Sequence, residues 1–145
     1  MTAILTNALV DAGPLIAAGV KRDQYHRVVT RWLRSHQATI LFTTLPALTE
    51  ACHTLKPALQ AALLRSIDAG TIRICPIEET DMAHAADLIE RYHDRPMDFA
   101  DATLVVAAEK LGITDIVSVD HADFDIYRTS AGRSFHNHLP RIPGR

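Results

Sequence analysis

The chain has 145 residues, of which 48% are hydrophobic and 22% charged, with a formal net charge of −2. These values predict one globular domain over residues 1–145 with a real core, and no apolar run approaches the ~18 residues that a membrane helix needs. The N-terminus lacks the basic region of a signal peptide. Cys52 and Cys75 lie far apart in apolar surroundings, so we expect two buried free thiols in a reducing cytoplasm.

The first segment of the chain predicts a strand followed by two helices. Residues 5–10 are apolar enough for a short buried strand, which ends at Asp11. Pro14 suits the first position of the short helix PLIAAGV that follows. Over residues 23–36, apolar side chains recur at helical spacing, and Asp23 is the predicted N-cap of this second helix.

The middle of the chain predicts a strand, two helices and another strand. Residues 38–44 are β-branched and apolar, as expected for a strand. Two helices follow over residues 45–55 and 57–70, and Gly70 ends the second. Residues 71–77 then predict a third strand.

The last third of the chain continues this alternation. Residues 78–94 predict a helix with its N-cap near Thr80, and residues 97–110 predict another that stops at a glycine C-cap. Residues 114–120 predict a fourth strand, and residues 135–140 an edge strand. Strands that alternate with helices indicate a three-layer α/β/α sandwich with a mainly parallel sheet, although the pattern does not give the strand order.

Carboxylates fall where such a sheet binds ligands, outside the carboxyl ends of its strands. Asp11 and Asp120 each end a predicted strand, and Glu50 follows the second strand on an apolar helix face. Asp98 and Asp101 lie one turn apart at the start of the helix that leads to the fourth strand. Without these five acids the rest of the chain carries an excess of basic residues, which suits a polyanionic substrate.

Several carboxylates in one cleft repel each other, and a divalent cation relieves that repulsion. Oxygen ligands without Cys or paired His favour Mg²⁺ or Mn²⁺ over zinc. The residues therefore predict a metal-dependent phosphoryl-transfer or hydrolysis site. Helix capping by Asp98 and Asp101, and turn formation by Asp11 before Gly13, are alternatives that need no metal.

Four segments in this order, LVDAGPLIAA, TTLPALTEA, MDFADATLVVAAEKLG and IVSVDHADFDIYR, resemble the PIN domain, and in particular the VapC toxins of bacterial toxin–antitoxin pairs. The resemblance covers about residues 8–128. It implies a PIN-like fold and a Mg²⁺- or Mn²⁺-dependent endoribonuclease that cleaves RNA, with tRNA or rRNA as expected targets. It also implies a homodimer that a cognate antitoxin holds inactive.

The resemblance assigns the acids residue by residue. Asp11, Glu50, Asp101 and Asp120 match the four acidic positions of the family, and Asp98 precedes the third by one turn. On this basis Asp11, Asp101 and Asp120 hold the ion or ions with Asp98 as a further ligand, and Glu50 binds through water or orients the attacking water.

Two nearby features of the same motifs carry further expectations. Asp123 also matches a family position, where we expect it to cap or pair locally. Many relatives have Thr or Ser after the first Asp, but this chain has Ala12, so Thr43, Thr44 or Ser118 is expected to supply the missing hydroxyl.

Two other readings of the sequence stay open. A receiver-like signalling module also binds Mg²⁺ through clustered Asp residues, but it needs a central phosphoacceptor Asp and a late Lys that this chain lacks. A non-catalytic binding protein on a nuclease fold is the second alternative.

Two surface features bear on partners. Basic residues are candidates for phosphate contacts, namely Lys21, Arg22, Arg31, Arg34 and Lys56. The apolar stretch from Leu45 to Leu64 exceeds what a small core needs and predicts a groove for an antitoxin segment or a second protomer.

Overall fold

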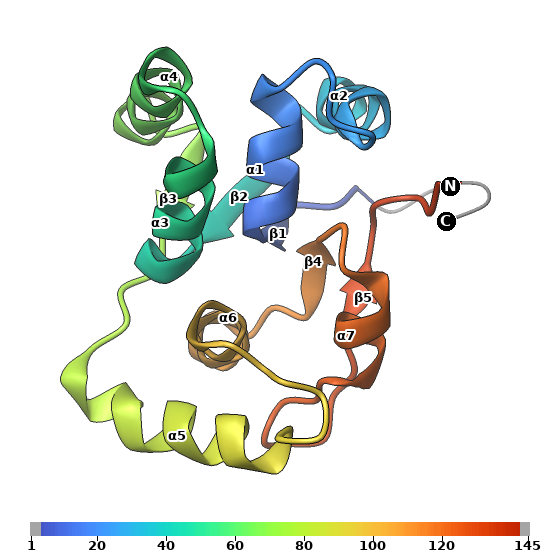
Figure 1. The fold of residues 1–145 in the computed structure, drawn as a ribbon. Helices are drawn as coiled ribbons and strands as arrows, with labels where there is room; N and C mark the ends of the chain where they lie inside the picture. Colours follow the sequence, from blue (N-terminus) through green and yellow to red (C-terminus); the bar gives the residue numbers. More distant parts are fainter. Residues whose placement is uncertain (1–3, 143–145) are drawn as a thin grey trace.

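In the computed structural model, which describes residues 4–142, five parallel strands form one sheet with helices on both faces (Figure 1). The strands are β1 (Asn7–Val10), β2 (Ile40–Thr43), β3 (Ile72–Ile74), β4 (Asp115–Val117) and β5 (His136–Asn137). Their order is β3-β2-β1-β4-β5, and every pairing is parallel. The predicted α/β/α sandwich and its edge strand are confirmed.

The order of the strands fixes where a ligand site belongs. From β1 the chain builds outward through β2 to β3, and it then returns to place β4 on the other side of β1. The carboxyl ends of β1 and β4 therefore flank the point where the strand order reverses, which is the usual ligand crevice of an open parallel sheet. The order also differs from the 2-1-3-4-5 order of receiver-like modules.

Side chains alternate between the two faces of the central strand, so each face has its own core. Ala8 and Val10 of β1 pack against α1 (Ala12–Gly19), α2 (His26–Ser35) and α4 (Pro57–Asp68). Leu9 between them packs on the opposite core, against α6 (Phe99–Leu111). The helices α5 (Met82–Arg91) and α7 (His121–Ile126) complete this second layer, and α3 (Leu45–Thr54) contacts both α1 and α6.

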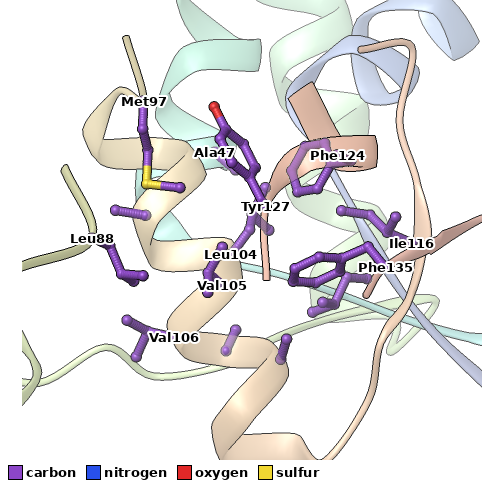
Figure 2. Packing of buried hydrophobic residues seen from close by; sticks show 14 of the residues in the cluster. Ala47, Leu88, Met97, Leu104, Val105, Val106, Ile116, Phe124, Tyr127 and Phe135 are labelled. Atoms are coloured by element: carbon purple, nitrogen blue, oxygen red, sulfur yellow. The ribbon is translucent and has the colours of Figure 1, made fainter. Parts of the chain in front are cut away.

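Helix α6 is the best buried helix of the molecule. Residues 100 and 102–108 are all buried, and Leu104 and Val105 are inaccessible to solvent. Figure 2 shows these side chains beside an aromatic group that includes Tyr127, Phe124 and Phe135. The rings of Phe124 and Tyr127 meet edge to face with centroids 5.3 Å apart, a favoured aromatic geometry.

Several predicted boundaries are wrong in detail. Helix α1 begins at Ala12, so Pro14 occupies its third position rather than its first; the first-turn N–H groups have no helical partner, which makes proline tolerable there as well. Helix α2 begins at His26 without a side-chain cap, because Asp23 caps the turn before it and accepts from the Tyr25 N–H at 2.8 Å.

The fifth helix also starts later than predicted. A short 3-10 helix (Glu79–Asp81) precedes α5, and its N-cap is Glu78, not Thr80. Asp81 completes this capping box and accepts a hydrogen bond from Lys110 of α6 at 2.9 Å. Cys75 is buried as expected, but Cys52 is only half-buried; both thiols are free within the described residues.

Candidate functional site

The five predicted acids line one pocket of about 280 Å³ at the carboxyl ends of β1 and β4. The remaining lining residues include Ile16, Pro96 and Asp123. Residues from four separate parts of the sequence thus meet at the point where the strand order reverses. The predicted convergence of Asp11, Glu50, Asp98, Asp101 and Asp120 is what the fold produces.

Asp11 is the most buried of these acids, with 8% of its surface exposed. It follows β1 and is the N-cap of α1, where its Oδ1 accepts the Ala12 N–H at 2.7 Å. Its Oδ2 accepts the Ser118 hydroxyl at 3.1 Å. Burial raises the pKa of Asp11 although both hydrogen bonds favour the carboxylate.

Ser118 supplies the hydroxyl that Ala12 lacks. Its Oγ donates to Asp11 and accepts the backbone N–H of Asp120 at 3.0 Å, so one hydroxyl joins two of the acidic segments. Thr44 instead hydrogen-bonds Thr103 at 2.8 Å, and the buried Thr43 hydroxyl has no partner among the described residues. Of the three predicted candidates, only Ser118 contacts Asp11.

Asp98 and Asp101, both at the start of α6, differ in burial and in hydrogen bonds. Asp98 is the exposed N-cap, and its Oδ1 accepts the Asp101 N–H at 2.8 Å. Asp101 lies deeper, and its Oδ2 accepts the phenol hydroxyl of Tyr127 at 3.1 Å. Burial, with the nearby charges of Asp11 and Asp98, raises the pKa of Asp101 to about 8. Capping by Asp98 is therefore observed, and it leaves the second carboxylate oxygen of this residue free for another role.

Asp120 follows β4 by three residues and is the N-cap of α7. Burial and the adjacent Asp123 carboxyl raise the pKa of Asp120 to about 6. Asp123 also accepts from Arg95 Nη1 at 3.0 Å. The ion-pair partner of Asp123 thus lies 28 residues away in the sequence, so the expectation that Asp123 caps or pairs locally is wrong.

Glu50 stands at the rim of the pocket. The sequence predicts it on an apolar face of its helix, but in α3 the side chain is exposed while Leu48 and Ala51 are buried. Partial burial, followed by the charges of Asp98 and Asp11, raises the pKa of Glu50. An exposed carboxylate at a pocket rim can reach a bound water or a substrate without losing core packing.

Position 13, two residues after Asp11, has room only for glycine. A Cβ at this position would lie 2.4 Å from the Val119 Cγ2, a distance that real structures do not show. The start of α1 therefore passes close to the segment between β4 and Asp120, which brings Asp11 and Asp120 to the same pocket.

Two residues of the site were not predicted. Tyr127 has no exposed surface, and burial with the charge of Asp101 raises the pKa of its phenol, so the phenol stays a proton donor to Asp101. Arg95 lies between the two helices predicted over residues 78–94 and 97–110, and no role is predicted for it from the sequence. Both residues lie more than 20 positions from their acidic partners in the sequence. A prediction of helix α7, which directly precedes Tyr127, would have been the one sequence signal for this residue, but that helix is not predicted from the sequence.

The donor set suits a hard divalent cation, because it consists of carboxylate oxygens whose pKa values are raised by burial and by each other. Within the described residues, no three His, Cys, Asp or Glu side chains are already arranged to hold an ion. Binding therefore requires side-chain rotation, and the exposed Glu50 has no hydrogen bond among the described residues that opposes it, whereas Asp98 and Asp120 each hold a backbone N–H as N-caps.

The sequence matches the PIN domain over residues 8–131. The chain belongs to the PIN domain family. No curated protein matches it closely enough to count as a relative. Family membership and the strand order exclude the receiver-like alternative.

Two solved structures share this PIN fold. The Mycobacterium tuberculosis toxin VapC20, described as cleaving the sarcin–ricin loop, has a TM-score of 0.73 at 19% identity and covers 92% of this chain and 99% of its own. The FitAB complex with an IR36 DNA fragment has a TM-score of 0.58 at 19% identity, covering 92% of this chain and 98% of the matched chain. At this identity the likeness concerns the fold alone.

Among residues 4–142, no helix combines the length and hydropathy that crossing a bilayer requires.

Proposed function

We propose that this chain is a VapC-like endoribonuclease toxin that cleaves RNA with Mg²⁺ or Mn²⁺ and is neutralised by a cognate antitoxin. One observation carries the proposal: in a PIN domain, acids from four separate segments share one pocket and raise each other's pKa values. VapC20, with the same fold, is an RNA-cleaving toxin, and FitAB is a complex bound to DNA. The cytoplasmic location stays a prediction.

In this proposal the four aspartates bind the ion or ions, and Glu50 has a separate role. Asp11, Asp101 and Asp120 would hold the ion or ions, with Asp98 as a further ligand, and the bound cation would activate water and offset charge on the leaving 3′-oxygen. Ser118 and Tyr127 hold the buried carboxylates in place through one oxygen each. Glu50 would bind an ion through water or orient the attacking water, because its exposed carboxylate lies in the lining of the pocket.

Cleavage of labelled total tRNA and rRNA by the purified protein, with Mg²⁺ or with EDTA, tests the proposed function. Asp101→Asn keeps the shape of the side chain and an acceptor for Tyr127 but removes the charge, so we expect cleavage to fall about 100-fold or more. Asp87→Asn, an exposed change on α5, is the matched control and should keep wild-type cleavage. Wild-type activity of Asp101→Asn, or undiminished cleavage in EDTA, would refute the assignment.

The same assay separates the enzyme from the remaining alternative. A non-catalytic binding protein on a nuclease fold would bind RNA but leave it intact with either ion. Titration calorimetry with Mn²⁺ gives an independent measurement that needs no RNA. We expect Asp101→Asn to bind the ion more weakly than the wild type.

The surface of α4 supports the proposed homodimer and antitoxin contacts. No residue of this helix is buried, and its Leu64 is 50% exposed. Large exposed apolar side chains are typical of a surface that a partner covers. Light scattering of the purified protein should give a dimer mass, and a small protein encoded beside it should co-purify; an active monomer without a partner would contradict this part.

A further inference from the structure

A second hollow of about 680 Å³ adjoins the acidic pocket along α1. Ile16 lines both, so the two hollows lie next to each other at this residue. The second hollow lies where the α1–α2 loop approaches the start of α4, with Val20 and Leu59 among its apolar lining. Figure 1 shows α1 between α2 on one side and the α3–α4 pair on the other.

Three cations stand along this hollow, and we name Lys21, Arg22 and Lys56 together the cationic shelf. All three side chains are exposed, and none forms an ion pair with another residue in the described part of the chain. The one carboxylate in the lining, Asp23, already accepts the Tyr25 N–H at 2.8 Å. The shelf thus presents unpaired positive charge beside a pocket that is strongly acidic.

We propose that the cationic shelf binds the phosphates of a single-stranded segment of the RNA substrate and directs that strand along α1 into the acidic pocket. The inference rests on the proposed function. An acidic pocket by itself repels a polyanion, so the strand must gain its binding energy from cations outside the pocket. Helix α1, with eight residues, spans about 12 Å, which a few nucleotides can bridge.

The composition of the hollow favours a single strand over a duplex. Exposed Lys and Arg side chains contact phosphates without reading sequence, and apolar surface between them accepts the faces of unstacked bases or riboses. The acidic pocket, which is proposed to cleave phosphodiester bonds, lies next to this hollow. This position favours RNA over an acidic protein segment, since cleavage requires that one phosphate of the bound strand reach the acids.

A second basic group on the protein provides a matched control. Arg27, Arg31 and Arg34 of α2 are also exposed and also line hollows, but those hollows share no residue with the acidic pocket. Replacing either triplet with alanine removes the same formal charge. A difference in RNA affinity between the two triple variants therefore depends on where the charges lie and not on the net charge of the protein.

The test is fluorescence anisotropy of a labelled unstructured RNA oligonucleotide with the full chain in EDTA, over a range of salt concentrations. The triple variant Lys21→Ala, Arg22→Ala, Lys56→Ala should bind on the order of tenfold more weakly, and the slope of log K against log salt should shrink by about 2. The Arg27, Arg31, Arg34 triple variant should bind within about twofold of wild type. Lys21→Arg with Lys56→Arg keeps the charge and should bind like wild type.

Equal losses from both triplets would overturn the proposal, because they would indicate diffuse attraction. Unchanged RNA binding by the shelf variant would also overturn the proposal. This holds even if the variant loses binding to a protein partner, because the shelf would then be a protein-binding surface. Wild-type RNA cleavage with Mg²⁺ tests the proposed function separately. If the shelf variant unfolds, as shown by circular dichroism, single Lys56→Glu and Arg31→Glu variants replace the triplets in the same comparison.

Discussion

Helices α6 and α4 lie on opposite faces of the same sheet and differ in how deeply their side chains are buried. Eight residues of α6 are buried, whereas α4 has none. The helix that is packed from every side also carries Asp98 and Asp101 at its start, so the most rigid part of the core positions the acids. Helix α4 packs on the core only through half-buried side chains such as Leu63 and Ile67, and it begins beside the cationic shelf, where the substrate is proposed to bind.

The sharpest test of this comparison is a pair of leucine truncations. Leu104→Ala removes a fully buried side chain from α6 and should lower the free energy of unfolding by about 2–5 kcal/mol. Leu64→Ala on α4, where the side chain is 50% exposed, should change it by no more than about 0.5 kcal/mol at protein concentrations that keep the chain monomeric. Urea unfolding measures both, and equal effects would contradict the comparison.

A second prediction concerns the close approach of α1 to the end of β4. Gly13→Ala places a methyl group 2.4 Å from Val119 Cγ2, so either the Val119 side chain must rotate or the backbone must shift. We expect a loss of about 1–3 kcal/mol in the free energy of unfolding and reduced RNA cleavage. Gly19→Ala is the control for the free energy of unfolding alone, because its Cβ would meet Leu59 at an ordinary 3.5 Å and Gly19 itself lines the hollow beside the cationic shelf. Equal effects at the two glycines would show that the approach to Val119 has no special role.

The third prediction concerns pH in the metal-free protein. Asp101, beside Asp11, Asp98, Asp120 and Tyr127, has its pKa raised from 3.8 to about 8, so the folded state holds a proton that the unfolded chain releases near pH 4. Stability in EDTA should therefore fall as pH rises from about 4 to 8. Asp101→Asn should reduce this slope and gain about 0.5–2 kcal/mol at neutral pH. Thermal unfolding across this pH range checks both, and a slope unchanged in the variant would contradict the assignment.

The smallest predicted effect is that of Tyr127→Phe, which removes only the hydroxyl that donates to Asp101 at 3.1 Å. We expect a cost of about 0.5–1.5 kcal/mol and weaker Mn²⁺ binding, because Asp101 loses the contact that fixes its carboxylate. Tyr92→Phe is the control, since its hydroxyl accepts the Arg128 N–H and not an acid of the pocket. Calorimetry should show weaker Mn²⁺ binding for Tyr127→Phe alone.

The acids could be predicted because each lies next to a pattern that depends on local sequence. A buried strand before Asp11, another before Asp120 and a helix start at Asp98 are visible without knowing what each element packs against. The layered α/β architecture follows from the same alternation of strands and helices.

What could not be predicted depends on register between distant segments. The strand order, the contact of Tyr127 with Asp101 and the ion pair of Arg95 with Asp123 are set by how α6, α7 and the sheet dock. The N-caps assigned to Asp23 and Thr80 are wrong because those residues belong to turns that replace the first helical turn. Whether the acids bind Mg²⁺ or Mn²⁺ stays a prediction.

The hydrogen bond from Ser118 to Asp11 joins residues 107 positions apart, and it forms only when β4 takes its place beside β1. A ribosome makes Asp11 before it makes Ser118 and Asp120. A nascent chain that does not yet contain β4 therefore cannot assemble the pocket. If the proposed activity is right, the nuclease site stays inactive until β4 has been made and has paired with β1.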